Sequence, residues 1–434
     1  MARDIVYAGI DVGTCKITTV ISIYDEESDK IRVVGVATKE SRGIRKSQVV
    51  DIEETIDAVT DSVEAAERMA GFSISDAYIS ISGSHIQSQN SKGVVAVADS
   101  GNEITDDDVS RVIESARAVS LPSSREILHV IPRDFIVDSQ PGIKDPVSMT
   151  GVRLEAETHI ITGASPAIRN LVKCISEIGI NVTSVVFSGL ASSESVLTET
   201  EKELGVCLID IGGGSTSLTV FTEGALTHTA VLPIGAKHIT NDLAIGLRVS
   251  LEQAEKIKLA LSINPKEKLL LNPSESNDLL NPTKLGVNKE DIAKPSYKTL
   301  VDGIIKARLV EIYTMVSAEL KKAGLLAATP AGIVLSSGGA LTVNADKICK
   351  QTMSMAVRTA VLDGTQKTNV QLTGLIDEIS SPIFSVAQGL IIYASQQGGS
   401  VASSAFSGLG NMIQKIPSQG ILKKTIAFVK SFLP

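Results

Sequence analysis

Several residue types are scarce in this chain of 434 residues, and their scarcity limits what the protein can do. Tryptophan is absent, aromatic residues make up 3%, and the formal net charge is −8. Nucleic-acid binding is therefore disfavoured, because it needs a basic face interleaved with stacking side chains. The four cysteines are far apart and lack the paired spacings of a zinc site, so we expect reduced thiols that mainly fill cores: Cys15, Cys174, Cys207 and Cys349.

Membrane-spanning and secretory signals are also missing from the pattern. The amino terminus leads directly into a strand pattern, and no apolar run reaches the length of a transmembrane helix. We therefore expect a cytoplasmic protein. A hydrophobic content of 43% over this length predicts two or more domains with proper cores.

The stretch LGVCLIDIGGGSTSLTVF, residues 204–221, predicts a buried strand, a tight loop and a second strand. Three consecutive glycines, Gly212 to Gly214, allow backbone N–H groups to converge on phosphate oxygens. Ser215 and Thr216 add hydroxyl donors, and Asp210 is placed to reach Mg²⁺ through water. Taken alone, this stretch is equally compatible with an ordinary glycine turn between two core strands.

A second copy of this pattern occurs about two hundred residues earlier, in AGIDVGTCKITTVI. Asp11 aligns with Asp210 and Gly13 with Gly212, which predicts a duplicated architecture whose two halves face one nucleotide. Lys16 in the first copy supplies a point charge suited to terminal phosphates. Neither loop has the spacing of a P-loop or of a dinucleotide fingerprint.

The rest of the chain adds an insertion and a third glycine turn. Residues 84–163 have their own helix and strands, and we expect the acidic run Thr105 to Asp108 to cap a helix. Glu255 and Lys258 lie on one helix face and could be a weak surface ion pair. Residues 264–295 suggest an irregular hairpin, 300–323 a long amphipathic helix, and Ser336 to Ala340 the third glycine turn.

The carboxyl-terminal end has a different composition from the rest. Gly and Ser are frequent from Gln396 to Gly420, which is typical of a flexible linker, and ILKKTIAFVKSFLP follows. At about 100° per residue the apolar side chains fill one arc and the polar arc is purely cationic. This predicts a helix in the membrane interface, rather than one docked on the protein's own core, through Ile421, Leu422, Lys423, Lys424, Ile426, Phe428, Val429, Lys430, Phe432 and Leu433.

Together these features resemble the actin, Hsp70 and sugar-kinase superfamily and, within it, the FtsA family of bacterial cell-division proteins. The specific stretches include ISGSHIQSQNSKGVV, GLASSESVLTETEKELGVCLIDIGGG and GAKHITNDLAIGLRVSLEQAEKIKL. The resemblance implies an α/β fold: a duplicated actin-like (ribonuclease H-like) two-domain fold with an inserted α+β subdomain and a C-terminal amphipathic helix. It also implies a domain plan of 1–83 with 164–197 and 381–396, the insertion 84–163, 198–234 with 306–380, a subdomain 235–305, a linker 397–420 and a membrane helix 421–434.

The resemblance further implies ATP between the two halves, with Mg²⁺ near Asp11 and Asp210. The nucleotide-binding positions carried over are Gly13, Thr14, Cys15, Lys16, Gly212, Gly213, Gly214, Ser215, Gly235, His238, Glu255, Lys258, Gly338, Gly339 and Ala340. Implied partners are the C-terminal tail of the tubulin-like FtsZ at residues 235–305, other copies in a head-to-tail polymer, later division proteins at the insertion, and anionic membrane.

One departure from the superfamily predicts slow hydrolysis. Hsp70-like ATPases place a carboxylate where this chain has Ser188, and a serine is a weak base for activating water. We therefore expect the nucleotide to act mainly as a conformational and polymerisation effector, and turnover as fast as that of a metabolic kinase would contradict this. Ser217 stands where many relatives carry aspartate, which leaves that contact open.

Two other functions compete with that of a membrane adaptor. A sugar-kinase-type phosphotransferase would need an aspartate base in a substrate cleft and would not need a cationic tail, so Ser188 and the tail count against it. A pilus-assembly ATPase resembling PilM would bind a membrane protein's tail, but it lacks such a terminal helix.

Overall fold

The computed structural model describes residues 5–25, 30–98, 101–263, 279–285, 296–362 and 371–398. Residues up to Ser395 form one compact unit. Most of the predicted hairpin at 264–295, nearly all of the linker and the whole membrane helix lie outside the described residues. Within the described part, no helix has the length and apolar character that crossing a membrane requires.

The first half is built on a six-stranded sheet in the order β11-β6-β1-β2-β3-β17. Its antiparallel strands β1, β2 and β3 continue into parallel β6 and β11. The strands are β1 (Ile5–Val12), β2 (Lys16–Asp25), β3 (Lys30–Glu40), β6 (Asp76–Ile81), β11 (Asn181–Phe187) and β17 (Gln371–Gly374), and a small hairpin joins β4 (Ile44–Arg45) to β5 (Gln48–Val49).

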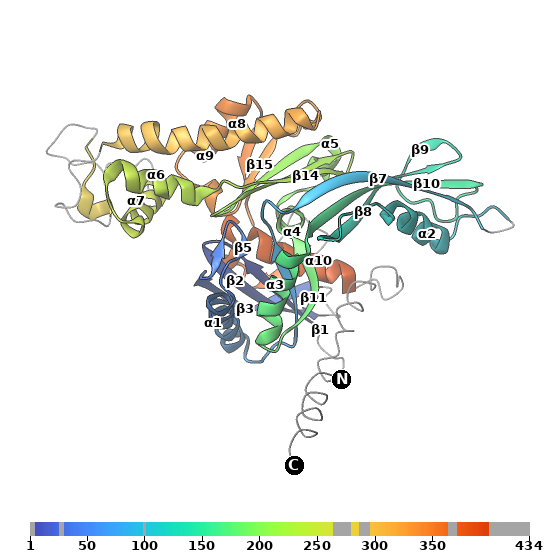
Figure 1. The fold of residues 1–434 in the computed structure, drawn as a ribbon, viewed down its shortest axis with the longest axis horizontal. Coiled ribbons are helices and arrows are strands. Elements are labelled where there is room, and N and C mark those ends of the chain that lie inside the picture. The colour runs from blue at the N-terminus through green and yellow to red at the C-terminus, as the bar shows by residue number, and fades with distance from the viewer. Residues whose placement is uncertain are drawn as a thin grey trace, which may run out of the picture. The chain divides into compact units, whose positions relative to one another are not determined.

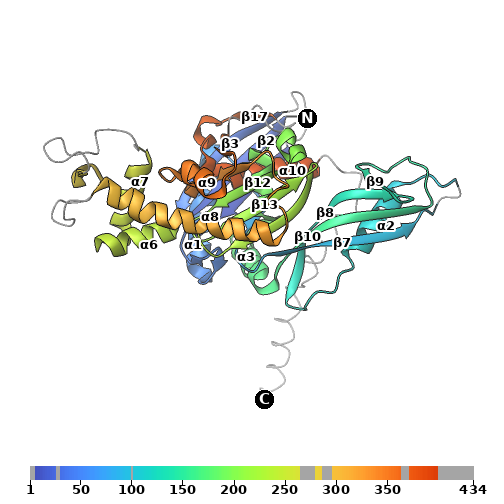
Figure 2. The same ribbon diagram turned by 90° about the horizontal axis from the view of Figure 1, so that it is seen from above.

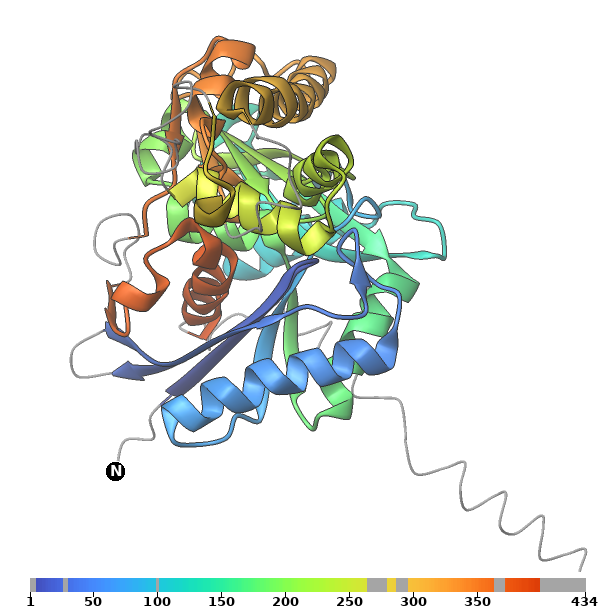
Figure 3. The same cartoon turned by 90° about the vertical axis from the view of Figure 1, so that its left-hand side faces the viewer.

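Helices cover both faces of this sheet, as Figure 3 shows for α1 along the strands. The helix α1 begins after Asp51, whose side chain accepts the Glu54 N–H, and ends at Gly71 in a left-handed conformation. Its buried face packs on β2 and β3, while α10 lies so close to Gly9 that an added Cβ would stand 2.9 Å from Leu390 Cβ. The helices of this half are α1 (Ile52–Ala70), α3 (Ser165–Glu177), α4 (Ser188–Val196) and α10 (Ser385–Gly398).

The second half repeats the same strand order in a five-stranded sheet, β14-β13-β12-β15-β16. Three antiparallel strands again lead into two parallel ones, so the duplication predicted from the two loops is confirmed. Its elements are β12 (Val206–Ile211), β13 (Thr216–Thr222), β14 (Ala225–Leu232), β15 (Ile333–Ser336), β16 (Val357–Thr359), α5 (Glu199–Leu204) and α9 (Ala345–Met353).

A helical subdomain is attached to the second half (Figure 1). It contains α6 (Ala236–Leu247), α7 (Leu251–Ile263), the 3₁₀ turn Pro282–Leu285, the π-helical segment Lys298–Ile305 and α8 (Lys306–Lys322). The predicted long helix at 300–323 therefore begins two residues earlier, and its first eight residues are wound as a π-helix. Its buried face includes Leu309, Ile312, Tyr313 and Val316, which belong to the core of the second half.

The insertion is an antiparallel sheet in the order β7-β10-β8-β9 with one covering helix, α2. It comprises β7 (Gln87–Ala96), α2 (Asp106–Arg117), β8 (Arg125–Val137), β9 (Gln140–Ile143) and β10 (Arg153–Ala164), and has its own small core. The strand β8 continues through Pro132, and its pairing with β10 shifts register beside this residue.

The insertion also contacts the second half, because β7 lies beside β14 (Figure 1). Figure 2 shows the insertion from above, with β7, β10 and β8 side by side. Ser88 Oγ donates to the Thr229 carbonyl at 2.8 Å, and Asn90 Nδ2 donates to the Thr227 carbonyl at 3.4 Å. The buried imidazole of His159 lies between Asn90 and Thr229, with Nδ1 2.6 Å from Asn90 Oδ1 and Nε2 3.2 Å from Thr229 Oγ1. Burial lowers the pKa of His159 to about 3, so the imidazole in this contact between the insertion and β14 is neutral.

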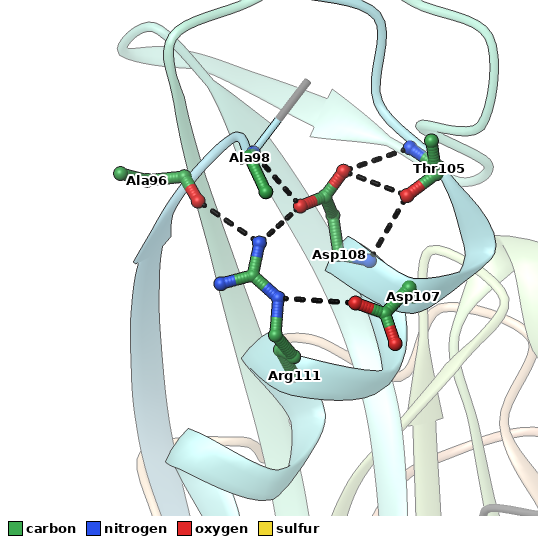
Figure 4. A network of polar contacts seen from close by, with 6 residues as sticks. All are labelled: Ala96, Ala98, Thr105, Asp107, Asp108 and Arg111. Carbon is green, nitrogen blue, oxygen red and sulfur yellow. Dashed lines mark hydrogen bonds and ion pairs between the residues drawn. The ribbon is translucent and has the colours of Figure 1, made fainter. Parts of the chain in front are cut away.

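The acidic run at the start of α2 caps the helix, as the sequence predicts (Figure 4). The carboxylate of Asp108 is 1% exposed and accepts from Thr105 N at 3.0 Å, Thr105 Oγ1 at 2.8 Å and Ala98 N at 3.2 Å. Arg111 pairs with it from the next turn and also donates to the Ala96 carbonyl. Burial alone would raise the pKa of Asp108, but these bonds outweigh it and hold the pKa at about 2.

Asp108→Ala is expected to destabilise the insertion by about 2–3 kcal/mol, because it leaves the N–H groups of Thr105 and Ala98 without their acceptor. Asp107→Ala is the matched control: its side chain is 81% exposed, and its loss should cost less than about 0.5 kcal/mol. Hydrogen exchange of the α2 and β7 amides measures both. Since the pKa of Asp108 is depressed, its contribution should be present above pH 4 and be lost as the pH falls through about 2. Equal protection in the two variants would contradict this account.

Candidate functional site

The two glycine-rich loops adopt the same turn in the two halves. Asp11 pairs with Thr18 and Asp210 with Ser217 at equivalent positions of their hairpins. The Gly13 N–H donates to the Lys16 carbonyl at 3.0 Å, and the Gly212 N–H donates to the Ser215 carbonyl at 2.9 Å. The repeat found in the sequence is therefore a repeat of local geometry.

Both loops border one cavity of about 580 Å³, a size suited to a small-molecule ligand. The predicted positions that line it are Asp11, Gly13, Thr14, Cys15, Lys16, Asp210, Gly212, Gly213, Ser215, Glu255, Lys258, Gly338 and Gly339. The structure thus brings together residues from four separate parts of the chain. Their role in binding a cofactor stays a prediction.

Two of the three carboxylates in this cavity, Asp11 and Asp210, form no ion pair with any described residue. Asp11 Oδ1 accepts from Ser80 Oγ at 2.7 Å, and burial raises the pKa of Asp11 despite that bond and the charge of Lys16. Asp210 is 5% exposed, and one of its oxygens, Oδ2, has no hydrogen-bond partner. Burial and then the charge of Asp11 raise the pKa of Asp210 to about 7, although hydroxyls of Ser337 and Ser192 oppose this.

These carboxylates fit a hydrated Mg²⁺ better than a metal held by protein ligands alone. Among the described residues, no group of three or more His, Cys, Asp or Glu side chains could hold a metal ion. Mg²⁺ binds through one or two carboxylates and keeps several waters, so it does not need such a group. The unpartnered oxygen of Asp210 would gain a partner, and ionised Asp210 would gain a compensating charge.

Lys16 lines the cavity, and its ammonium group contacts Ile383 and Phe384. Lys16 Nζ donates to the Ile383 carbonyl at 2.5 Å and stands 5.2 Å from the centre of the Phe384 ring. Burial lowers the pKa of Lys16, while Asp11 and Asp210 act in the opposite direction. A phosphate contact would require this side chain to turn from Ile383 toward the loops.

Glu255 and Lys258 form a network in the cavity wall. Lys258 Nζ donates to Glu255 Oε2 at 2.8 Å and to Thr240 Oγ1 at 2.9 Å, and Thr240 donates to the same carboxylate oxygen at 2.5 Å. Lys258 is 7% exposed, whereas the Glu255 side chain is 42% exposed, so only the cation of the predicted surface ion pair is buried. Thr240, on α6, holds the pair in place.

Four predicted positions do not line the cavity. An added Cβ on Gly214 would stand 2.7 Å from Thr14 Oγ1, so this glycine permits a close approach of the two loops. Gly235 and His238 begin α6, where the Gly235 N–H donates to His238 Nδ1 at 3.1 Å. Ala340 is 4% exposed in the core of the second half.

Cys15 departs from the expectation of core-filling thiols. Cys174, Cys207 and Cys349 are buried, but Cys15 is exposed at the tip of the first loop. A Cβ added to Gly213 would stand 2.3 Å from Cys15 Sγ, so the tip of the first loop contacts the second loop across the cavity. The tight turn of the first loop leaves no core for this side chain to fill.

Several lining residues were not found from the sequence. Leu259, Ile263 and Leu341 form an apolar wall and are 49%, 74% and 42% exposed. Helical spacing from Glu255 could have indicated Leu259 and Ile263, which lie on the same side of α7. Val12 and Ser337 lie within the predicted loops, and Ser262 follows Lys258 at helical spacing. No local pattern marks the other lining residues, because the fold brings them in from separate segments: Ser47, Ser80, Ser82, Ala236, Thr342, Ile383 and Val386.

Two duplicated halves, equivalent Asp-Gly loops and a cavity between them define a fold of the actin-like ATPase type. Family comparison then identifies the particular family. Residues 83–162 match the family model described as the SHS2 domain inserted in FTSA, and residues 207–389 match the one described as Cell division protein FtsA. The chain belongs to the FtsA family of cell-division proteins.

Curated relatives agree with this assignment, and a solved structure shares the fold. FtsA of Pseudomonas aeruginosa is 36% identical over 92% of this chain and 92% of its own, and FtsA of Borreliella burgdorferi is 39% identical over the same shares. A chain of the PilM-PilN type IV pilus biogenesis complex superposes with a TM-score of 0.63 over 89% of this chain and 98% of its own. That chain is 14% identical, so the likeness extends to the fold alone. The first family model begins one residue before the predicted insertion at 84–163, and the other domain boundaries remain predictions.

Proposed function

We propose that this protein binds Mg²⁺ and ATP between its two actin-like halves and uses the bound state to fix their arrangement. The observation that carries the proposal is the pair of equivalent Asp-Gly loops facing one cavity, with an unpartnered, buried carboxylate oxygen on Asp210. The N–H groups of Gly13 and Gly212 close the two turns, so the loop amides that follow them, together with the hydroxyls of Thr14 and Ser215, would hold phosphates. When bound, Mg²⁺ would neutralise charge on both the phosphates and the two carboxylates.

The remaining walls suit the other two parts of the nucleotide. Glu255 and Lys258 offer a fixed acceptor and a fixed donor for ribose hydroxyls. Leu259, Ile263 and Leu341 offer apolar side chains against which a planar base can pack, beside Gly338 and Gly339. Bound ATP would then cover apolar surface of the protein that is otherwise exposed to water.

We further propose that hydrolysis is slow and that the nucleotide acts as an effector. Ser188 lines the cavity where superfamily ATPases place a carboxylate, and it is 7% exposed. The acidic side chains in the lining already have proposed roles: Asp11 and Asp210 would bind Mg²⁺, and Glu255 would bind ribose. A base for the attacking water is therefore missing from the described lining.

In the cell we propose that the chain tethers FtsZ filaments to the cytoplasmic face of the membrane at the division site. Membership of the FtsA family supports this role, as does the cationic amphipathic sequence at 421–434. The same family supports head-to-tail polymers and recruitment of later division proteins through the insertion. Each of these is a proposal for this chain.

A groove between α6 and α8 is the proposed site for the FtsZ tail. It has a volume of about 360 Å³ and is lined by Asp242, Ile245, Gly246, Ile304, Ala307, Arg308 and Glu311. Ile245 is 77% exposed at its edge, and Arg308 is fixed by Asp242 through bonds of 2.6 and 2.8 Å. An apolar side chain of a short peptide would meet Ile245, next to Arg308, which is already paired with Asp242 and Glu311. Three of the lining residues lie beyond the predicted range 235–305.

Ile245→Ser is expected to weaken binding of the FtsZ tail peptide about tenfold or more, because it removes an exposed apolar anchor. Leu204→Ser is the matched control, since Leu204 is 59% exposed on α5 and does not line this groove. Fluorescence anisotropy with a labelled peptide of the FtsZ carboxyl terminus measures both affinities. Equal affinities for the two variants would remove this groove as the site, and no binding by the unchanged protein would remove FtsZ as the partner.

A further inference from the structure

A small hairpin between the first sheet and α1 reaches the two nucleotide loops. Its strands β4 and β5 are joined by Lys46 and Ser47, whose φ angles are +49° and +61°. Two-residue turns with both φ angles positive favour Asn-Gly, because glycine and asparagine tolerate the left-handed region better than other residues do. Strained non-glycine turns persist where surrounding contacts fix them, often at functional sites.

Ser47 bonds to both halves of the protein. Its backbone N–H donates to Thr14 Oγ1 at 2.9 Å, in the first loop. Its hydroxyl lies 2.8 Å from Ser215 Oγ, in the second loop, and 3.3 Å from Thr14 Oγ1. All three residues line the cavity.

The tip of the hairpin is also packed tightly against the second loop. A Cβ added to Gly214 would stand 2.9 Å from Lys46 Cα, a backbone atom that cannot rotate away. The hairpin therefore has little freedom to move while the two loops stay in place. Ser47 is held at one position relative to Thr14 and Ser215.

The direction of these bonds decides where the hydroxyl protons of the loops can point. A hydroxyl has one proton to donate and can accept two bonds. Thr14 Oγ1 accepts the backbone N–H of Ser47, so its own proton is free to point elsewhere. If Ser47 Oγ donates to Ser215 Oγ, the proton of Ser215 is likewise free to point into the cavity.

We propose that Ser47 is a positioning residue of the phosphate site, which aligns the hydroxyl of Ser215 so that it donates to a bound phosphate. This inference rests on the proposed nucleotide binding and adds a third segment to the two loops. The hydroxyl of Ser47 reaches the phosphate site from the first half and fixes a donor that belongs to the second half. The strained turn is the conformation that brings it there.

The test is a double-mutant cycle on Mg²⁺–ATP binding to the full chain, measured by calorimetry. Ser47→Ala and Ser215→Ala are each expected to weaken binding about tenfold, and the double variant should be little weaker than either single one. Ser47→Gly should weaken binding as much as Ser47→Ala does. It should melt at a higher temperature than Ser47→Ala, because glycine adopts the left-handed backbone without strain. Ser148→Gly is the matched control, since Ser148 has a φ of +66° in the insertion: it should raise the melting temperature and leave the affinity unchanged.

Two outcomes would overturn the inference. Affinity of Ser47→Ala within twofold of the unchanged protein would mean that its hydroxyl does not act on the phosphate site. Losses that multiply in the double variant would mean that Ser47 does not act through Ser215. Failure of the unchanged protein to bind Mg²⁺–ATP would instead overturn the proposed function itself.

Discussion

Asp210→Asn is expected to stabilise the nucleotide-free protein at pH 8 by about 4 kcal/mol and to weaken Mg²⁺–ATP binding about 10- to 100-fold. Both effects come from one buried group. Burial raises the pKa of Asp210 to about 7, so ionising it in the folded protein is costly. The same negative charge is what would attract Mg²⁺ to the cavity, and an amide cannot supply it.

The pH dependence has a definite sign. In the unfolded chain Asp210 ionises near its ordinary pKa of 3.8, while in the folded chain it keeps its proton until about pH 7. The unfolded state therefore binds fewer protons between these values, and the free energy of unfolding falls as the pH rises from about 4 to about 7. Asparagine has no such transition, so the advantage of the variant should be absent near pH 4 and fully present at pH 8.

Chemical unfolding at a series of pH values, with calorimetry of Mg²⁺–ATP binding, measures both effects. Asp107→Asn, an 81% exposed aspartate of the insertion, is the control that should change neither. Binding of Mg²⁺–ATP to the unchanged protein should also strengthen as the pH rises through 7, because the carboxylate must lose its proton. A variant that gains no stability, or one that keeps its affinity, would contradict the assignment of Asp210.

Ending the chain at Gly420 is expected to abolish its flotation with anionic vesicles. The removed sequence, 421–434, carries Lys423, Lys424 and Lys430 and no acidic side chain. Near an anionic surface each lysine contributes about 1 kcal/mol, so the three together correspond to roughly a hundredfold preference for anionic over neutral lipid. The apolar side chains of the same sequence supply the rest of the attraction.

Single substitutions can separate an interfacial helix from a general cationic attraction. Phe428→Ser on the apolar arc should reduce flotation strongly, whereas Ser431→Ala on the polar arc should leave it unchanged. The shortened chain should still bind Mg²⁺–ATP, which establishes that its cavity is intact. Equal flotation of full and shortened chains would remove the membrane proposal.

Many residues that line the cavity could be predicted from the sequence, because its two loops are local structures. A strand that ends in Asp, followed by glycines and a second strand, encodes its own turn, so Asp11 and Asp210 could be aligned before any fold was known. The helix spacing of Glu255 and Lys258 was likewise readable. The burial of Lys258 and its bond to Thr240 were not, because they depend on a neighbouring helix.

The sequence by itself therefore determined the duplicated halves, the family and the composition of the tail. Only the tertiary structure decided which hydroxyls meet: Ser47, Thr14 and Ser215 come from three segments, and their bonds depend on how two sheets pack. It also decided that Asp210 would be buried without a partner for Oδ2, and that Gly235 and His238 would cap a helix instead of lining the cavity. The physical reason is that a turn or helix face is fixed by neighbours along the chain, whereas burial and partnership are fixed by residues far away in sequence.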